Sequence, residues 1–170
     1  MIVTRTPFRV TLGGGGTDLP SYYSQHGGFI FAMGLDKFMY VMVNRPVIGR
    51  KIRLHYSQAE TVDRVDDLRH ELAREALKAH GIEDAFEVAS IADLPAGTGL
   101  GSSSCYLIGL LNALHHDRRD YVPLQTLANG GVVRLTSFCN KQEYEAPAWL
   151  TWSVLLEGAF VRPLTPSQPP

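Results

Sequence analysis

The sequence predicts an α+β fold, because strand-like segments, one amphipathic helix and one apolar helix share a chain of 170 residues. Residues 2–12, 29–43 and 86–95 are rich in β-branched and aromatic residues, as is typical of strands. A helix is expected over residues 66–82, where leucines recur on one face and a glycine follows as a stop signal. Residues 102–115 are apolar enough for a buried helix.

The remaining segments follow in order. Pro7 interrupts the first strand, and residues 13–28 form a loop with glycine runs at both ends. Residues 29–43 make one or two buried strands, and residues 50–57 continue the strand pattern after a turn. Residues 162–170 form a proline-rich tail that we expect to be disordered.

Composition excludes several function classes. A net charge of -1 argues against a general nucleic-acid or membrane-surface binder, either of which would carry a basic excess. The longest apolar stretch, residues 149–161, is interrupted by Glu157 and is too short to span a bilayer. Cys105 and Cys139 lack metal-ligand spacing, as expected in a reducing compartment. No signal peptide is evident, so we expect a cytoplasmic protein.

The segment LPAGTGLGSSSC, residues 94–105, joins a predicted strand to a predicted helix through alternating glycines. Backbone N–H groups at such a helix start bind anions, phosphates above all. No lysine follows as in a Walker A loop, and the glycine spacing is not the Rossmann one. From these residues alone, a simple glycine-rich turn capped by Ser102 remains an equal alternative.

Two motifs together resemble the GHMP kinases, the family of galactokinase, homoserine kinase, mevalonate kinase and phosphomevalonate kinase. Their second motif is P-x-x-x-G-L-G-S-S, and the matching residues here are Pro95, Gly99, Leu100, Gly101, Ser102 and Ser103. The opening segment, residues 6–41, is similar to the family's first motif, especially in its heptose-phosphate kinase branch. The resemblance covers residues 1–128 and implies a GHMP-kinase N-terminal domain. That fold is ribosomal protein S5 domain 2-like, with a mixed sheet and helices on one side.

The resemblance also implies roles for individual residues. The loop from Gly97 to Ser103 would wrap the phosphates of ATP, and Ser103 would contact Mg²⁺. Asp18 would accept hydrogen bonds from sugar hydroxyls in a pocket shaped by Thr17. Arg9 would lie near the transferred phosphoryl group and stabilise its charge. Two alternatives remain open: Asp18 as a plain turn residue, and Arg9 as a surface residue of its strand.

The activity implied is that of an ATP-dependent kinase acting on a sugar or sugar phosphate, most like heptose 7-phosphate kinase. Two alternatives are a non-catalytic fragment that binds nucleotide or sugar phosphate, and a degenerate kinase remnant. Neither a nucleic acid nor a membrane is expected as a partner.

The resemblance ends near residue 128. Residues 129–161 form a divergent or truncated remainder, for which a truncated or frame-disrupted gene is our explanation. Within it, Glu143 lies nearest the position of the family's catalytic aspartate. Apolar residues of this segment would lack their usual cover, so we expect self-association. They are Trp149, Leu150, Trp152, Val154, Leu155 and Leu156.

Overall fold

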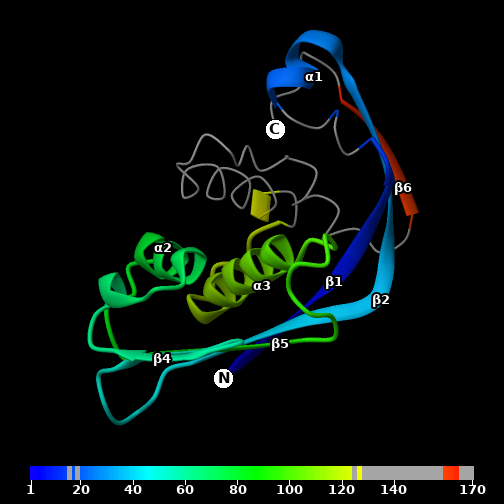
Figure 1. Ribbon diagram of the computed structural model, residues 1–170. Coiled ribbons are helices and arrows are strands. Elements are labelled where there is room, and N and C mark those ends of the chain that lie inside the picture. The colour runs from blue at the N-terminus through cyan, green and yellow to red at the C-terminus, as the bar shows by residue number, and fades with distance from the viewer. Residues whose placement is uncertain (15–16, 18–19, 124–125, 128–158, 165–170) are drawn as a thin grey trace.

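The computed structural model describes residues 1–14, 17, 20–123, 126–127 and 159–164. Within these ranges, six strands form one sheet in the order β1-β2-β5-β3-β4, with β6 paired to β2. The main helices lie on one side of this sheet (Figure 1). The strands are β1 (Ile2–Gly13), β2 (Gly28–Asn44), β3 (Ile52–His55), β4 (Ala59–Val62), β5 (Phe86–Ala92) and β6 (Ala159–Leu164). The α-helices are α1 (Pro20–His26), α2 (Glu71–Ala79) and α3 (Ser102–Asp117).

The sheet is mixed, as the resemblance implied. β2 pairs antiparallel with both β1 and β5, whereas β3 and β5 are parallel. Pro7 does not end β1: the pairing with β2 shifts register between Pro7 and Arg9, and the strand continues. Such an irregularity accommodates a residue that has no N–H to donate. Residues 28–44 form a single strand, which settles the alternative of one or two.

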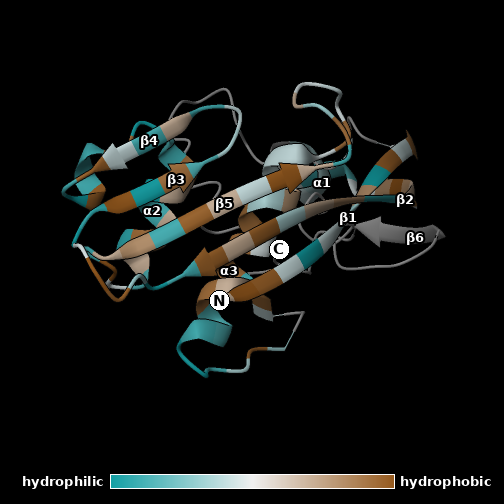
Figure 2. Ribbon diagram, turned by 90° about the horizontal axis from the view of Figure 1, so that it is seen from below, coloured by the Kyte–Doolittle hydropathy of each residue, from teal (hydrophilic) through white to brown (hydrophobic). Residues whose placement is uncertain are grey.

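The helices cover one face of the sheet. α3 lies over β1 and β2, and α2 packs beside α3. Every residue of α3 from Ser104 to Leu111 is buried, which confirms the predicted buried helix. The strands contribute Phe8, Val41, Val43, Ile52, Leu54, Phe86 and Val88 to the same core. Figure 2 shows the opposite side of the sheet, where hydrophobic and hydrophilic residues alternate along several strands, as the two-residue period of a strand requires.

Four details differ from the expected elements. Residues 20–26 form α1 instead of loop, because proline is favoured in the first turn of a helix. β4 was not predicted, since its segment is short and polar. The helix expected from residue 66 begins at Glu71, after a short 3₁₀ turn at Val65–Asp67. The tail boundary at residue 162 falls inside β6, whose Pro163 is tolerated in a strand that, within the described ranges, pairs only with β2.

Candidate nucleotide-binding site

The glycine loop joins the end of β5 to the start of α3. Gly97, Gly99 and Gly101 all have positive φ, at 83°, 72° and 85°. A Cβ added at Gly97 or Gly99 would meet no atom within 4 Å, so the backbone there is open to approach from solvent. Alternating bare residues therefore expose the backbone along the loop, which is the arrangement that anion-binding loops use.

The start of α3 has no side-chain cap. Gly101 is the N-cap residue, in the left-handed conformation with φ 85° and ψ 27°, and no side chain accepts a hydrogen bond there. The first intrahelical bond runs from the N–H of Cys105 to the carbonyl of Gly101, over 2.9 Å. The preceding N–H groups, of residues 102–104, thus have no partner within the helix, and the helix dipole adds positive potential. The Ser102 cap of that alternative is therefore wrong, while the phosphate-binding role of the loop stays a prediction.

The loop is held at both ends by the sheet. Asp93 accepts a 2.8 Å hydrogen bond from the N–H of Phe38 through its carboxylate and donates its own N–H to the Phe38 carbonyl over 3.0 Å. At the other end, Nη1 of Arg9 donates to the carbonyl of Gly99 over 3.0 Å. The loop is therefore positioned by β1 and β2 before any ligand arrives.

Arg9 is buried beneath this loop. Only 4% of the residue is exposed, so the alternative of a surface strand residue is wrong. Its guanidinium lies 3.4–3.5 Å from the point where a side chain on Gly101 would begin. A cation in this position favours negative charge on the outer side of the loop. The predicted contact with a transferred phosphoryl group stays a prediction.

Thr17 fastens the first glycine segment to β2. Its hydroxyl lies 2.9 Å from the carbonyl oxygens of both Gly14 and Phe29, and it accepts the Phe29 N–H over 3.1 Å. The turn is tight at Gly14, where a Cβ would lie 1.7 Å from the Phe29 carbonyl oxygen and φ is +86°. Thr17 thus has a structural task, whereas its predicted role in a sugar pocket stays a prediction. Asp18 lies outside the described residues.

Replacing Thr17 with valine should destabilise the protein by about 1–2 kcal/mol, because the Phe29 N–H loses its acceptor while the side-chain shape is kept. For a chain of this length, that loss lowers the melting temperature by about 2–8 °C in thermal unfolding followed by circular dichroism. Thr17→Ser, which keeps the hydroxyl, should melt close to the wild type. Equal melting of the serine and valine variants would contradict the assignment.

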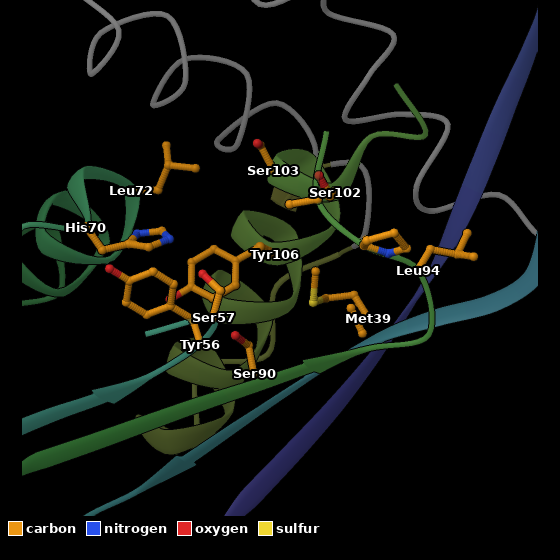
Figure 3. A pocket seen from close by; sticks show the side chains of 13 residues that line it. Met39, Tyr56, Ser57, His70, Leu72, Ser90, Leu94, Ser102, Ser103 and Tyr106 are labelled. Atoms are coloured by element: carbon orange, nitrogen blue, oxygen red, sulfur yellow. The ribbon is translucent and has the colours of Figure 1, made fainter. Parts of the chain in front are cut away.

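A cavity of about 360 Å³ opens beside the loop (Figure 3). Its wall comes from β2, β5, the β3–β4 turn, the start of α2, the loop and α3. The lining residues are Met39, Tyr56, Ser57, His70, Leu72, Ser90, Ala92, Leu94, Pro95, Ala96, Ser102, Ser103 and Tyr106. Aromatic and aliphatic side chains and four serines line this cavity, which ends at the glycine loop, and such a lining suits a molecule with a flat ring and a polar chain.

Three aromatic rings form one end of the cavity. The His70 ring lies 4.8 Å from Tyr56 and 4.9 Å from Tyr106, measured between centroids. Tyr56 is anchored by a 2.9 Å hydrogen bond from its hydroxyl to Glu60, and this bond raises the pKa of Tyr56. Desolvation works to raise the pKa of Glu60, yet hydrogen bonds from the Arg69 N–H and the Tyr56 hydroxyl bring that pKa below its usual value. These rings were missed by the sequence analysis, because they are far apart in the chain and follow no motif.

The hydroxyl of Tyr106 is buried and has no hydrogen-bond partner among the described residues, while burial raises its pKa. Tyr106→Phe removes this hydroxyl and should leave the free energy of unfolding unchanged or raise it by about 1 kcal/mol. Urea denaturation checks this. A loss of more than about 1 kcal/mol would mean that the hydroxyl has a partner.

The other predicted site residues are placed as follows. Pro95, Ser102 and Ser103 line the cavity, with Ser103 exposed at its mouth, and Leu100 is half-buried within the loop. Burial raises the pKa of the neighbouring Cys105 thiol to about 12, which keeps it unreactive. Glu143 and the apolar residues at 149–156 lie outside the described part of the chain.

Among the described residues, no three His, Cys, Asp or Glu side chains lie close enough to hold a metal ion. Within the same ranges, no helix combines the length and the apolar character needed to cross a membrane.

Several solved structures share the fold. A D-glycero-D-manno-heptose 1-phosphate kinase from Bacteroides thetaiotaomicron matches 99% of this chain with a TM-score of 0.82 and 16% identity. Streptococcus pneumoniae phosphomevalonate kinase, solved with phosphomevalonate and AMPPNP, matches 91% with a TM-score of 0.67 and 15% identity. Lactococcus lactis galactokinase, solved with galactose, matches 87% with a TM-score of 0.61 and 20% identity.

These matches cover 58%, 47% and 41% of the respective solved chains, so this chain spans about half of their length. No family model matches the sequence, and no curated protein matches it either. At these identities the likeness concerns the fold. The resemblance drawn from the two glycine-rich motifs is confirmed at that level: the chain has the fold of the GHMP-kinase N-terminal domain.

Proposed function

We propose that this chain is the nucleotide-binding half of an ATP-dependent kinase that phosphorylates a small molecule, a sugar or sugar phosphate. The observation that carries the proposal is the uncapped start of α3 behind three left-handed glycines, directly beside a cavity with an aromatic end. The N–H groups that lack a partner within the helix suit a chain of phosphates, and the cavity suits a base. The phosphomevalonate kinase of the same fold was solved with AMPPNP, an ATP analogue, which supports the choice of nucleotide.

The residues present fit ATP with Mg²⁺. The loop backbone at 97–103 would hold the phosphates, and the Arg9 cation beneath it would offset part of their charge. The exposed hydroxyl of Ser103 is a suitable oxygen ligand for Mg²⁺. Bound Mg²⁺ supplies charge neutralisation on the phosphates. The chain itself would position the phosphates along the loop.

The first glycine segment is the basis for our proposal of the phosphoryl acceptor. Asp18 would accept hydrogen bonds from sugar hydroxyls, with the adjacent turn fixed by Thr17. A heptose phosphate is our first choice of acceptor, since a heptose 1-phosphate kinase shares the fold and the opening motif is similar to that branch. Glu143 is the proposed catalytic carboxylate.

The test is ADP release from ATP and Mg²⁺ with a panel of acceptors: heptose 7-phosphate, heptose 1-phosphate, galactose and mevalonate. We expect weak turnover with a sugar phosphate, far below the 1–100 s⁻¹ typical of kinases, because the chain spans about half of its structural relatives. A second candidate, a binding fragment without catalysis, is favoured by the same short length. ATP binding with no ADP release from any acceptor would establish that candidate, and no ATP binding would exclude both.

A further inference from the structure

His70 lies in the wall of the cavity, at the start of α2. Its Nδ1 accepts a 3.2 Å hydrogen bond from the N–H of Ala73 and so caps the helix. A nitrogen that accepts this bond carries no proton. Burial also lowers the pKa of His70, which favours the neutral ring. The ring proton is therefore on Nε2.

The orientation of the ring is fixed by its neighbours. Tyr56 contacts it edge-on, with planes at 80°, and Tyr106 contacts it at 48°. In Figure 3 the ring extends from α2 between Leu72 and Tyr56, toward Tyr106. Nε2 forms no hydrogen bond with any described residue. His70 thus places an N–H donor in the wall of the cavity, beside aromatic and aliphatic side chains and the hydroxyls of Ser57, Ser90, Ser102 and Ser103.

We propose that Nε2–H of His70 donates a hydrogen bond to a ring nitrogen of the bound purine and makes His70 a determinant of base recognition. The inference rests on the proposed function, since it requires that a nucleotide occupies this cavity. N1, N3 and N7 of adenine are acceptors in the plane of the ring, so each can meet a single N–H donor. A pyrimidine base is smaller and offers fewer ring nitrogens at this distance from the phosphates.

The test compares ATP with its 1-deaza, 3-deaza and 7-deaza analogues, each of which replaces one acceptor nitrogen by C–H. Dissociation constants are measured by calorimetry with Mg²⁺ for the wild type and two variants. His70→Asn keeps an oxygen that can cap α2, but its shorter side chain moves the amide N–H away from the former position of Nε2. His70→Gln supplies an amide N–H near the former position of Nε2. Thermal melting of each variant verifies folding.

For the wild type we expect one analogue to bind about fivefold to tenfold more weakly than ATP, because its C–H leaves the donor unpaired. His70→Asn should bind that analogue and ATP equally, and His70→Gln should restore part of the difference. The inference would be overturned if the wild type bound ATP and all three analogues with equal dissociation constants. It would also be overturned if His70→Asn discriminated between ATP and the analogue as strongly as the wild type does. In both cases the proposed binding of ATP would stand. Failure of the wild type to bind ATP would overturn the proposed function and this inference together.

Discussion

Gly101→Val should abolish ATP binding, so that calorimetry with Mg²⁺ detects no heat up to about 1 mM nucleotide. The residue has φ +85°, and a Cβ there would lie 3.4 Å from the buried Arg9 guanidinium. A β-branched side chain at this N-cap position would press on Arg9 and displace the loop together with the first N–H groups of α3. The phosphates would lose both their N–H donors and the space in which to approach those donors.

The effect of backbone strain must be separated from the loss of ATP binding. Gly81→Val is the matched control, because Gly81 also has positive φ, at +62°, and has open space around it at the end of α2. Both variants should lose about 1–2 kcal/mol of folding free energy from the left-handed backbone. Only Gly101→Val should also lose ATP binding. Wild-type affinity in Gly101→Val would refute the loop assignment.

Arg9→Met should weaken the binding of ATP and ADP by equal factors of about 10-fold or more, with a loss of folding free energy of about 1.5–3 kcal/mol. The buried guanidinium donates to the Gly99 carbonyl and thereby supports the loop that we propose as the phosphate-binding loop. Arg9→Lys should recover little, because an ammonium cannot reproduce the planar fork.

The ratio of the ATP and ADP dissociation constants of Arg9→Met distinguishes support of the loop from direct contact with the terminal phosphate. A loss confined to ATP, with ADP binding unchanged, would contradict the supporting role and favour direct contact with the terminal phosphate. Arg5→Met is the control, since Arg5 lies on the same strand but is exposed, with its guanidinium 4.4 Å from the centre of the Phe38 ring. It should bind both nucleotides normally.

The fold was predictable where local pattern and tertiary structure agree. Strand-like runs such as residues 29–43 and the apolar segment from Ser102 are consistent with burial, and both formed as predicted. α1 was missed because glycines surround it and outweigh the signal of Pro20. β4 was missed because its pairing with β3, rather than its own sequence, makes it a strand.

The site was predictable in its loop and unpredictable in its cavity. Alternating glycines predict an open backbone before a helix from consecutive residues alone, and the loop has that geometry, whereas its binding of phosphates stays a prediction. Tyr56, His70 and Tyr106, by contrast, meet only because the β3–β4 turn, α2 and α3 converge. The burial of Arg9 likewise depends on how the loop folds back over β1, which the strand pattern alone does not reveal.

The central claim is that the loop from Gly97 to Ser103 holds the phosphates while the adjacent cavity holds the base. Hydrogen–deuterium exchange with mass spectrometry tests it directly, because amides that bind a ligand exchange more slowly. With ATP and Mg²⁺, we predict protection in peptides covering residues 94–106 and in those containing Ser57 and His70. Inorganic triphosphate should protect only the former, whereas adenosine should also protect the latter, because residues 94–96, 102, 103 and 106 line the cavity together with Ser57 and His70. Saturating ATP that leaves residues 94–106 unprotected would contradict the account.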